Sequence, residues 1–72
     1  MSDVEVEIMR YFRRYDVGVG KVLFFATGPA KAYPAQFGHA MASLVRRGMV
    51  VKERHRGAYS LTVRGYRASL SA

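Results

Sequence analysis

The sequence predicts one small domain of the α+β class, mainly helical, in which three helices precede a C-terminal β-hairpin. Three observations favour this class. Apolar side chains recur at helical spacing near the N-terminus, a proline and a glycine bracket a helical stretch at residues 34–48, and alternating β-prone residues flank a turn at residues 55–57. With 72 residues, the chain is expected to form a single domain, 1–72, around one core.

The first helix is expected over Asp3–Tyr15. Its apolar side chains are spaced by three and four residues, as one buried helix face requires: Val4, Ile8, Tyr11, Phe12 and Tyr15. Ser2 or Asp3 would cap its first turn. The glycine-containing segment 16–20 would then end it.

A second helix is expected over Lys21–Thr27. The run Val22–Ala26 is continuously apolar, and such a run does not by itself distinguish a short buried helix from a strand. We favour a helix because Gly28 suits the left-handed position that follows a helix and Pro29 would prevent its continuation. Residues 28–33 would then form a turn.

The third helix is expected over Pro34–Arg47, since proline suits a first helical turn and Gly48 suits the position just past the end. One apolar stripe would face the core, formed by Phe37, Met41, Leu44 and Val45. The opposite face would carry Gln36, His39, Ser43, Arg46 and Arg47, with the small Gly38 and Ala42 beside them. Gly38 weakens the helix and indicates either close approach to another surface or ordinary sequence drift.

A β-hairpin is expected over Met49–Thr62, with Gly57 in its turn at positive φ. If Val51, Tyr59 and Leu61 face the core, the hairpin cations reach solvent. A short last helix is expected over Val63–Leu70, capped by Thr62, packed through Tyr66 and Leu70, and shortened or frayed by Gly65.

Charge is distributed unevenly along the chain. Residues 1–16 carry a net charge of −1, and residues 17–72 carry +8, which together make +7. Such a field attracts polyanions and accelerates their encounter. The composition therefore favours nucleic acid as the partner.

Two stretches resemble the C-terminal half of winged helix-turn-helix domains. In the first, Leu44 is followed after three residues by Gly48 and two apolar residues. In the second, Tyr59 is followed by the pair Leu61–Thr62 and by Gly65. The resemblance covers about residues 33–66 and implies a winged helix-turn-helix fold, with a recognition helix that ends near Gly48 and a basic wing after it.

The resemblance also implies a mechanism of DNA binding. Side chains near the start of the recognition helix would meet base edges in the major groove: Tyr33, Gln36, His39 and Ser43. Phosphate contacts would come from Lys31, Arg46 and Arg47 and from the wing residues Lys52, Arg54, His55 and Arg56.

The expected function is therefore sequence-specific or semi-specific binding of double-stranded DNA by a small transcriptional regulator, cytoplasmic and nucleoid-associated. A homodimer through the first and last helices fits this function. Two alternatives stay open: an RNA-binding or ribosome-associated winged helix, and a protein-interaction module that uses Val22–Ala26, Tyr66 and Leu70.

Enzymatic and metal-binding classes are not expected. The segment Asp16–Val22 has only part of a phosphate-binding loop, because Tyr15 stands where that motif has glycine and Val22 where it has Ser or Thr. Two histidines without any cysteine form a poor ligand set. The sequence predicts no catalytic residue, no metal, no cofactor and no membrane contact.

Overall fold

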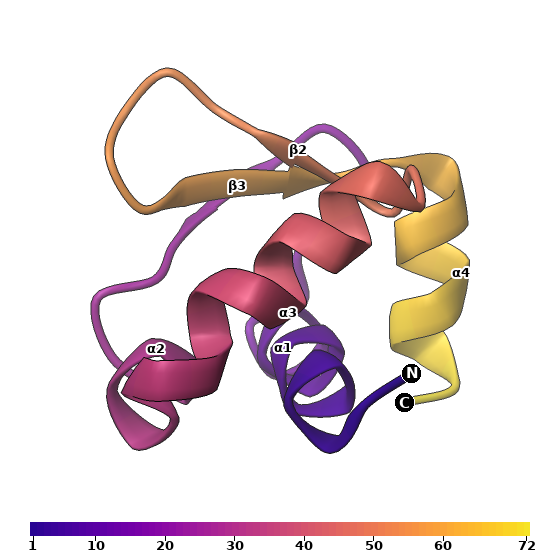
Figure 1. Ribbon diagram of the computed structural model, residues 1–72. Coiled ribbons are helices and arrows are strands. Elements are labelled where there is room, and N and C mark those ends of the chain that lie inside the picture. The colour runs from indigo at the N-terminus through magenta and orange to yellow at the C-terminus, as the bar shows by residue number, and fades with distance from the viewer.

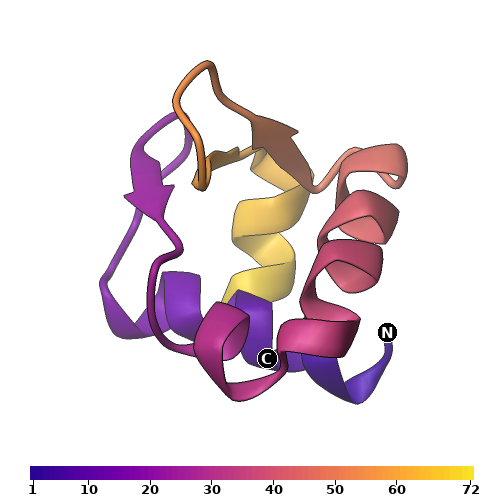
Figure 2. The ribbon, with the colours of Figure 1, turned by 60° about the vertical axis from the view of Figure 1, so that its left-hand side comes forward.

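The computed structural model describes residues 1–72 and contains four helices and one antiparallel sheet of three strands. Along the chain the elements are α1 (Asp3–Arg14), β1 (Val22–Phe24), α2 (Pro29–Ala32), α3 (Pro34–Arg46), β2 (Val50–Lys52), β3 (Ala58–Leu61) and α4 (Val63–Leu70) (Figure 1). The expected α+β class, mainly helical, is confirmed. The strands lie together on one side, and α1, α3 and α4 fill the rest of the molecule (Figure 2).

Helix α1 begins at a reciprocal cap. The hydroxyl of Ser2 accepts a hydrogen bond from the backbone N–H of Glu5 at 3.2 Å, and the Ser2 N–H donates to Glu5 Oε1 at 2.7 Å. These bonds satisfy two donors that the helix itself leaves free. The predicted helix is confirmed over Asp3–Arg14, and Ile8 and Phe12 on its inner face are fully buried. The expected place of Tyr15 on that face is wrong, because the helix ends before Tyr15, which caps its C-terminus and is 53% exposed.

The expected second helix over Lys21–Thr27 is wrong, because Val22–Phe24 forms a strand that pairs with β3 in antiparallel register, with Leu23 opposite Tyr59. Strand pairing with Tyr59, 36 residues later in the chain, decides between strand and helix here, and a local apolar pattern does not show such pairing. Gly28, at φ +61°, precedes a helix and does not end one. The expected turn at 28–33 contains the short helix α2, with Pro29 at its first position.

Helix α3 is confirmed with its predicted start at Pro34. Ala40, Met41 and Leu44 are buried on its inner face, and Phe37 is half-buried. The expected place of Val45 in the core stripe is wrong: Val45 is 37% exposed. Successive residues of a helix point about 100° apart, so Leu44 faces the core while Val45 points to the flank of α3 and is partly open to solvent.

The predicted hairpin is confirmed, with Gly57 at φ +75° in its turn. Strand β3 lies between β1 and β2. Val50, and not the expected Val51, faces the core, because Val50 lies opposite the buried Leu61 whereas Val51 lies opposite Ser60 on the other face.

Helix α4 forms over its predicted span, and the Thr62 hydroxyl accepts from the Gly65 N–H at 3.0 Å. Gly65 does not fray the helix. A Cβ there would lie 1.8 Å from the Met49 carbonyl oxygen, so only glycine permits this approach. Leu70, expected to pack inward, is 46% exposed.

Phe25 lies at the junction of the helices and the sheet. Its ring centroid is 5.1–5.8 Å from those of Tyr11, Phe12, Phe37 and Tyr59. Edge and tilted contacts of this kind add to the apolar burial. The core therefore ties α1, α3 and β3 around one ring. No helix combines the length and the apolar character needed to cross a bilayer.

Candidate nucleic-acid interface

The outward face of α3 is built largely from small residues. Ala35, Gly38 and Ala42 are exposed there, with His39 and Arg46 close by. A Cβ added at Gly38 would meet nothing within 4 Å. The helix therefore presents its backbone to solvent with little side-chain bulk over it.

A hollow separates this face from the hairpin. It is lined by Gly38, Met41, Ala42, Val45, Arg46, Lys52 and Tyr59. The Nζ atom of Lys52 lies 5.7 Å from the centre of the Tyr59 ring, a cation–π arrangement that keeps the ammonium at the rim of the hollow. Arg46 and Lys52 thus place two cations beside the small-residue face.

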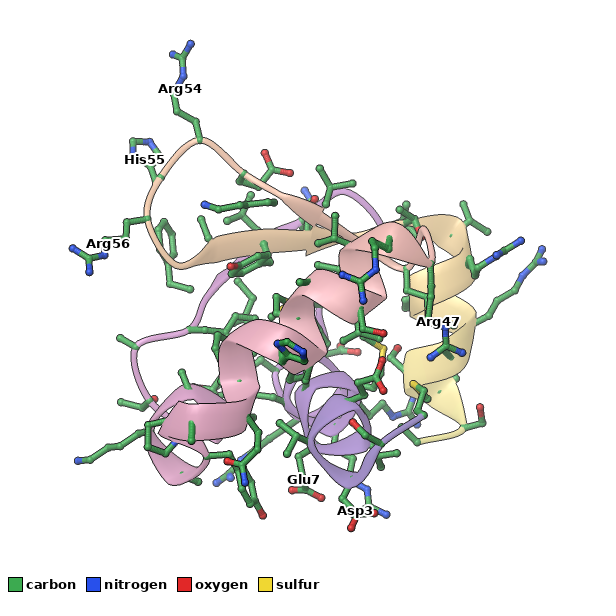
Figure 3. The ribbon with its side chains drawn as sticks, in the orientation of Figure 1. Asp3, Glu7, Arg47, Arg54, His55 and Arg56 are labelled. Atoms are coloured by element: carbon green, nitrogen blue, oxygen red, sulfur yellow. The ribbon has the colours of Figure 1, made fainter.

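The hairpin tip carries the remaining wing candidates. Arg54, His55 and Arg56 are all exposed and point away from the body of the protein (Figure 3). The nearest acid in sequence, Glu53, does not pair with them, because its Oε2 accepts a hydrogen bond from the Ser60 hydroxyl at 2.5 Å. The tip is therefore an uncompensated cationic projection.

The other four acidic residues lie within residues 1–16. Asp3 and Glu7, on α1, lie at the opposite end of the molecule from Arg54 (Figure 3). The ion pairs of the chain are Arg10 with Glu7 at 2.8 Å and Arg47 with Glu5 at 3.3 Å. The hairpin tip is therefore the positive end of the molecule, whereas α1, with three acids and three arginines, is neutral overall.

The two arginines at the end of α3 have different environments. Arg46 is exposed and lines the hollow beside the hairpin. Arg47 pairs with Glu5 of α1, and its carbonyl oxygen accepts a hydrogen bond from Arg64 at 3.3 Å. Of the two predicted phosphate ligands, Arg46 is unpaired and Arg47 joins two helices.

Glu5 is a buried carboxylate that is held in its charged form. Burial raises its pKa, but the hydrogen bond from the Ser2 N–H, the nearby hydroxyls of Ser43 and Ser2 and the charge of Arg47 outweigh burial and lower the pKa below 4.5. Ser43, a predicted base-reading residue, is half-buried and faces this carboxylate.

Gln36 and His39 are exposed on the side of α3 that faces the start of α1. Together with Ser43 and Arg46 they line a second hollow, whose other wall contains Ser2, Asp3 and Glu5. The predicted base-reading residues and the hairpin cations therefore lie on opposite sides of the outward face, and Arg46 lines the hollows on both sides.

Lys31 and Tyr33 lie near the start of α3. Lys31 is exposed on α2. Tyr33, between α2 and α3, is 37% exposed and lines a third hollow with Arg10, Tyr11 and Arg14 of α1. Tyr33 is thus set apart from the other base-reading candidates, and Arg14 is a neighbouring cation that the sequence analysis did not single out.

Sequence reasoning also missed Tyr59 and Lys52 as a stacked pair, since their contact depends on the register of β2 against β3. No three side chains of the His, Asp or Glu type come together as a metal site. Comparisons with protein-family models, with curated proteins and with solved structures give no match to this chain.

Proposed function

We propose that this protein binds double-stranded DNA as a winged helix-turn-helix domain, with α3 in the major groove and the β2–β3 hairpin along the phosphate backbone. One observation carries the proposal: an unpaired cationic hairpin stands beside a helix face that is nearly free of bulky side chains. DNA binding needs both features, because phosphates require cations and base edges require close approach.

The order of the elements supports the proposal. Helices α2 and α3 are separated by Tyr33 alone, and the hairpin follows α3 after three residues. A helix followed closely by a hairpin is the order that the resemblance over residues 33–66 implies for a recognition helix and its wing. The third strand, β1, attaches to the hairpin through β3 and so holds its base against the core.

The shape of α3 supports insertion into the groove. The major groove of B-DNA admits one α-helix, and small residues on the leading face let its backbone come near the bases. Gln36 and His39 flank that face with polar groups. Glutamine is suited to adenine, because its amide oxygen can accept from the N6 amino group while its amide nitrogen donates to N7.

The charge distribution supports one orientation. Arg46, Lys52, Arg54 and Arg56 would contact phosphates on the hairpin side, and Lys31 would do so near the start of α3. Asp3, on the side of α1, repels phosphate and therefore disfavours an orientation in which α1 and not the hairpin faces the DNA backbone. His55 would lie between the two arginines of the tip, and Arg47 would act by joining α3 to α1.

We further propose transcriptional regulation as the cellular role if binding depends on base sequence, and a position on the nucleoid. A homodimer would place two α3 helices about 34 Å apart on successive major grooves. Duplex RNA is the weaker candidate, because its deep and narrow major groove does not admit a helix.

Fluorescence anisotropy of the whole chain tests the proposal. Labelled duplex DNA, duplex RNA and single strands of one sequence would be titrated at two salt concentrations. We expect tightest binding to duplex DNA, with an affinity that falls steeply as salt rises. Tighter binding to duplex RNA, or no binding to any strand at low salt, would contradict the proposal and favour an RNA or protein partner.

A further inference from the structure

The outer face of the sheet exposes apolar side chains along its two edge strands. The strand register places Val22 and Phe24 of β1 and Val51 of β2 on the side of the sheet that faces away from the core. These side chains are 46%, 54% and 45% exposed. Between them β3 contributes the small and buried Ala58 and Ser60, and the Ser60 hydroxyl donates to the Glu53 carboxylate on the same side. The exposed apolar side chains of this face therefore come from the edge strands β1 and β2. Phe24 is the aromatic residue among them.

Phe24 lies beside the cationic hairpin tip. Its ring centroid is 6.5 Å from that of His55, with an angle of 43° between the ring planes. Arg54 and Arg56 are the sequence neighbours of His55, and all three are exposed. An exposed aromatic ring and an imidazole thus lie at one corner of the sheet, and the arginine on each side of the imidazole in the sequence extends from the same hairpin tip (Figure 3).

We propose that this corner binds an unpaired base of a nucleic-acid strand, stacked on Phe24, with the adjoining phosphate at Arg54 or Arg56. Every base has an apolar π face that stacks on an aromatic side chain, and cations beside the ring hold the backbone. Phe24 supplies the stacking surface, and the tip supplies the charge.

Charge complementarity favours this occupant over a second copy of the chain. Two copies packed through this face would bring two uncompensated cationic tips toward each other, on chains that each carry +7. Like charges at such an interface oppose association. A nucleic-acid strand supplies anionic phosphates for the cationic tip and apolar base faces for the Phe24 ring.

The geometry also defines the preferred nucleic acid. Lys52 and Tyr59 lie on one face of the sheet and Phe24 on the other, and the hairpin tip adjoins both. A duplex held by α3 and the hairpin could therefore pass a single-stranded end around the tip to Phe24. This part rests on the proposed function: the ligand is a duplex with a single-stranded overhang.

The test compares three labelled DNAs by anisotropy with the whole chain: a blunt duplex, the same duplex with an overhang, and the overhang strand alone. We expect the overhang to raise affinity by about tenfold, in the range that one stacked base contributes. Phe24→Ala should remove this gain and leave blunt-duplex affinity unchanged, and Phe24→Tyr should retain it. Tyr15→Ala is the matched control, because Tyr15 is an aromatic residue of nearly the same exposure, 53% against 54%, just past the end of α1.

Two results would overturn the inference. One is Phe24→Ala binding the overhang duplex as tightly as the unchanged chain does. The other is sedimentation of the unchanged chain as a dimer that Phe24→Ala converts to a monomer, because the face would then join two copies. If only the proposed function is wrong, the blunt duplex would not bind to the protein. The single strand would still bind, and Phe24→Ala would weaken that binding.

Discussion

The guanidinium of Arg47 lies 3.3 Å from the carboxylate of Glu5, and this contact joins the end of α3 to the start of α1 across 42 positions of the chain. Glu5 is also the acceptor in the cap of α1. One buried carboxylate thus fixes where α1 begins and how α3 lies against it. Glu5 therefore orients the proposed recognition helix without being one of its proposed DNA contacts.

Glu5→Gln should lower the free energy of unfolding by about 1 kcal/mol at pH 7, because charge-assisted hydrogen bonds are stronger than neutral ones. The pKa of Glu5 is lower in the folded state than its ordinary value of 4.5. Its contribution to stability is therefore fully present above pH 4.5 and is lost as the pH falls through the folded-state pKa. Urea unfolding from pH 7 to about pH 3 measures this.

The control for that experiment is Glu7→Gln, which alters an exposed pair with Arg10 and should change stability by less than about 0.5 kcal/mol at pH 7. Equal effects of the two substitutions would mean that the Glu5 carboxylate has no special role. The same conclusion would follow if the difference between Glu5→Gln and the unchanged chain did not shrink in acid.

Gly65→Ala should destabilise the fold by roughly 1–3 kcal/mol, since the new methyl group would lie 1.8 Å from the Met49 carbonyl oxygen and would push α4 away from β2. Gly38→Ala is the matched control, because it is also a helical glycine but faces open space. There the better helix propensity of alanine should add about 0.5–1 kcal/mol. Thermal unfolding of both variants should show shifts of opposite sign.

The elements that could be predicted from the sequence are those with local signals. Pro34 and Gly48 bracket α3, and Gly57 takes the positive φ that the hairpin turn needs. The strand β1 could not be predicted in this way. Its apolar run is compatible with helix or strand, and the choice depends on Tyr59 and its neighbours in β3, which are far away in sequence.

In the candidate site, too, some features could be predicted from the sequence and others depend on contacts between distant residues. Exposed cations at the hairpin tip follow from charge and turn chemistry. The difference between Arg46 and Arg47 does not, because it depends on where Glu5 lies. The exposure of Phe24 depends on strand register, which decides the face to which each side chain points.

Gly38→Leu should weaken duplex binding by at least tenfold if α3 enters the major groove, because a bulky side chain would hold the backbone away from the bases. The fold should tolerate it, since nothing lies within 4 Å of a Cβ at this position. Ser71→Leu, exposed beyond α4, is the control for added apolar surface. Unchanged affinity of Gly38→Leu would place the DNA on another surface.

The double substitution Arg54→Ala and Arg56→Ala should weaken binding to all duplexes alike and reduce the slope of log affinity against log salt by roughly 1.8, as expected for two lost phosphate contacts. Arg67→Ala removes an exposed cation from α4 and should leave the slope unchanged. Titrations at four salt concentrations give the slopes. An unaltered slope in the double variant would exclude the hairpin tip from the interface.

Gln36→Ala should reduce the sequence preference of DNA binding more than the overall affinity for DNA. Gln36 is exposed on the side of α3 away from the hairpin, where a base edge is the expected neighbour. After selection of a preferred duplex, we expect the variant to lose about 1–3 kcal/mol of discrimination at one A·T pair and little elsewhere. Affinities for a set of single-base substitutions measure this. Equal weakening across the set would mean that Gln36 contacts the DNA phosphate backbone and not a base. No weakening would mean that this side of α3 lies outside the groove.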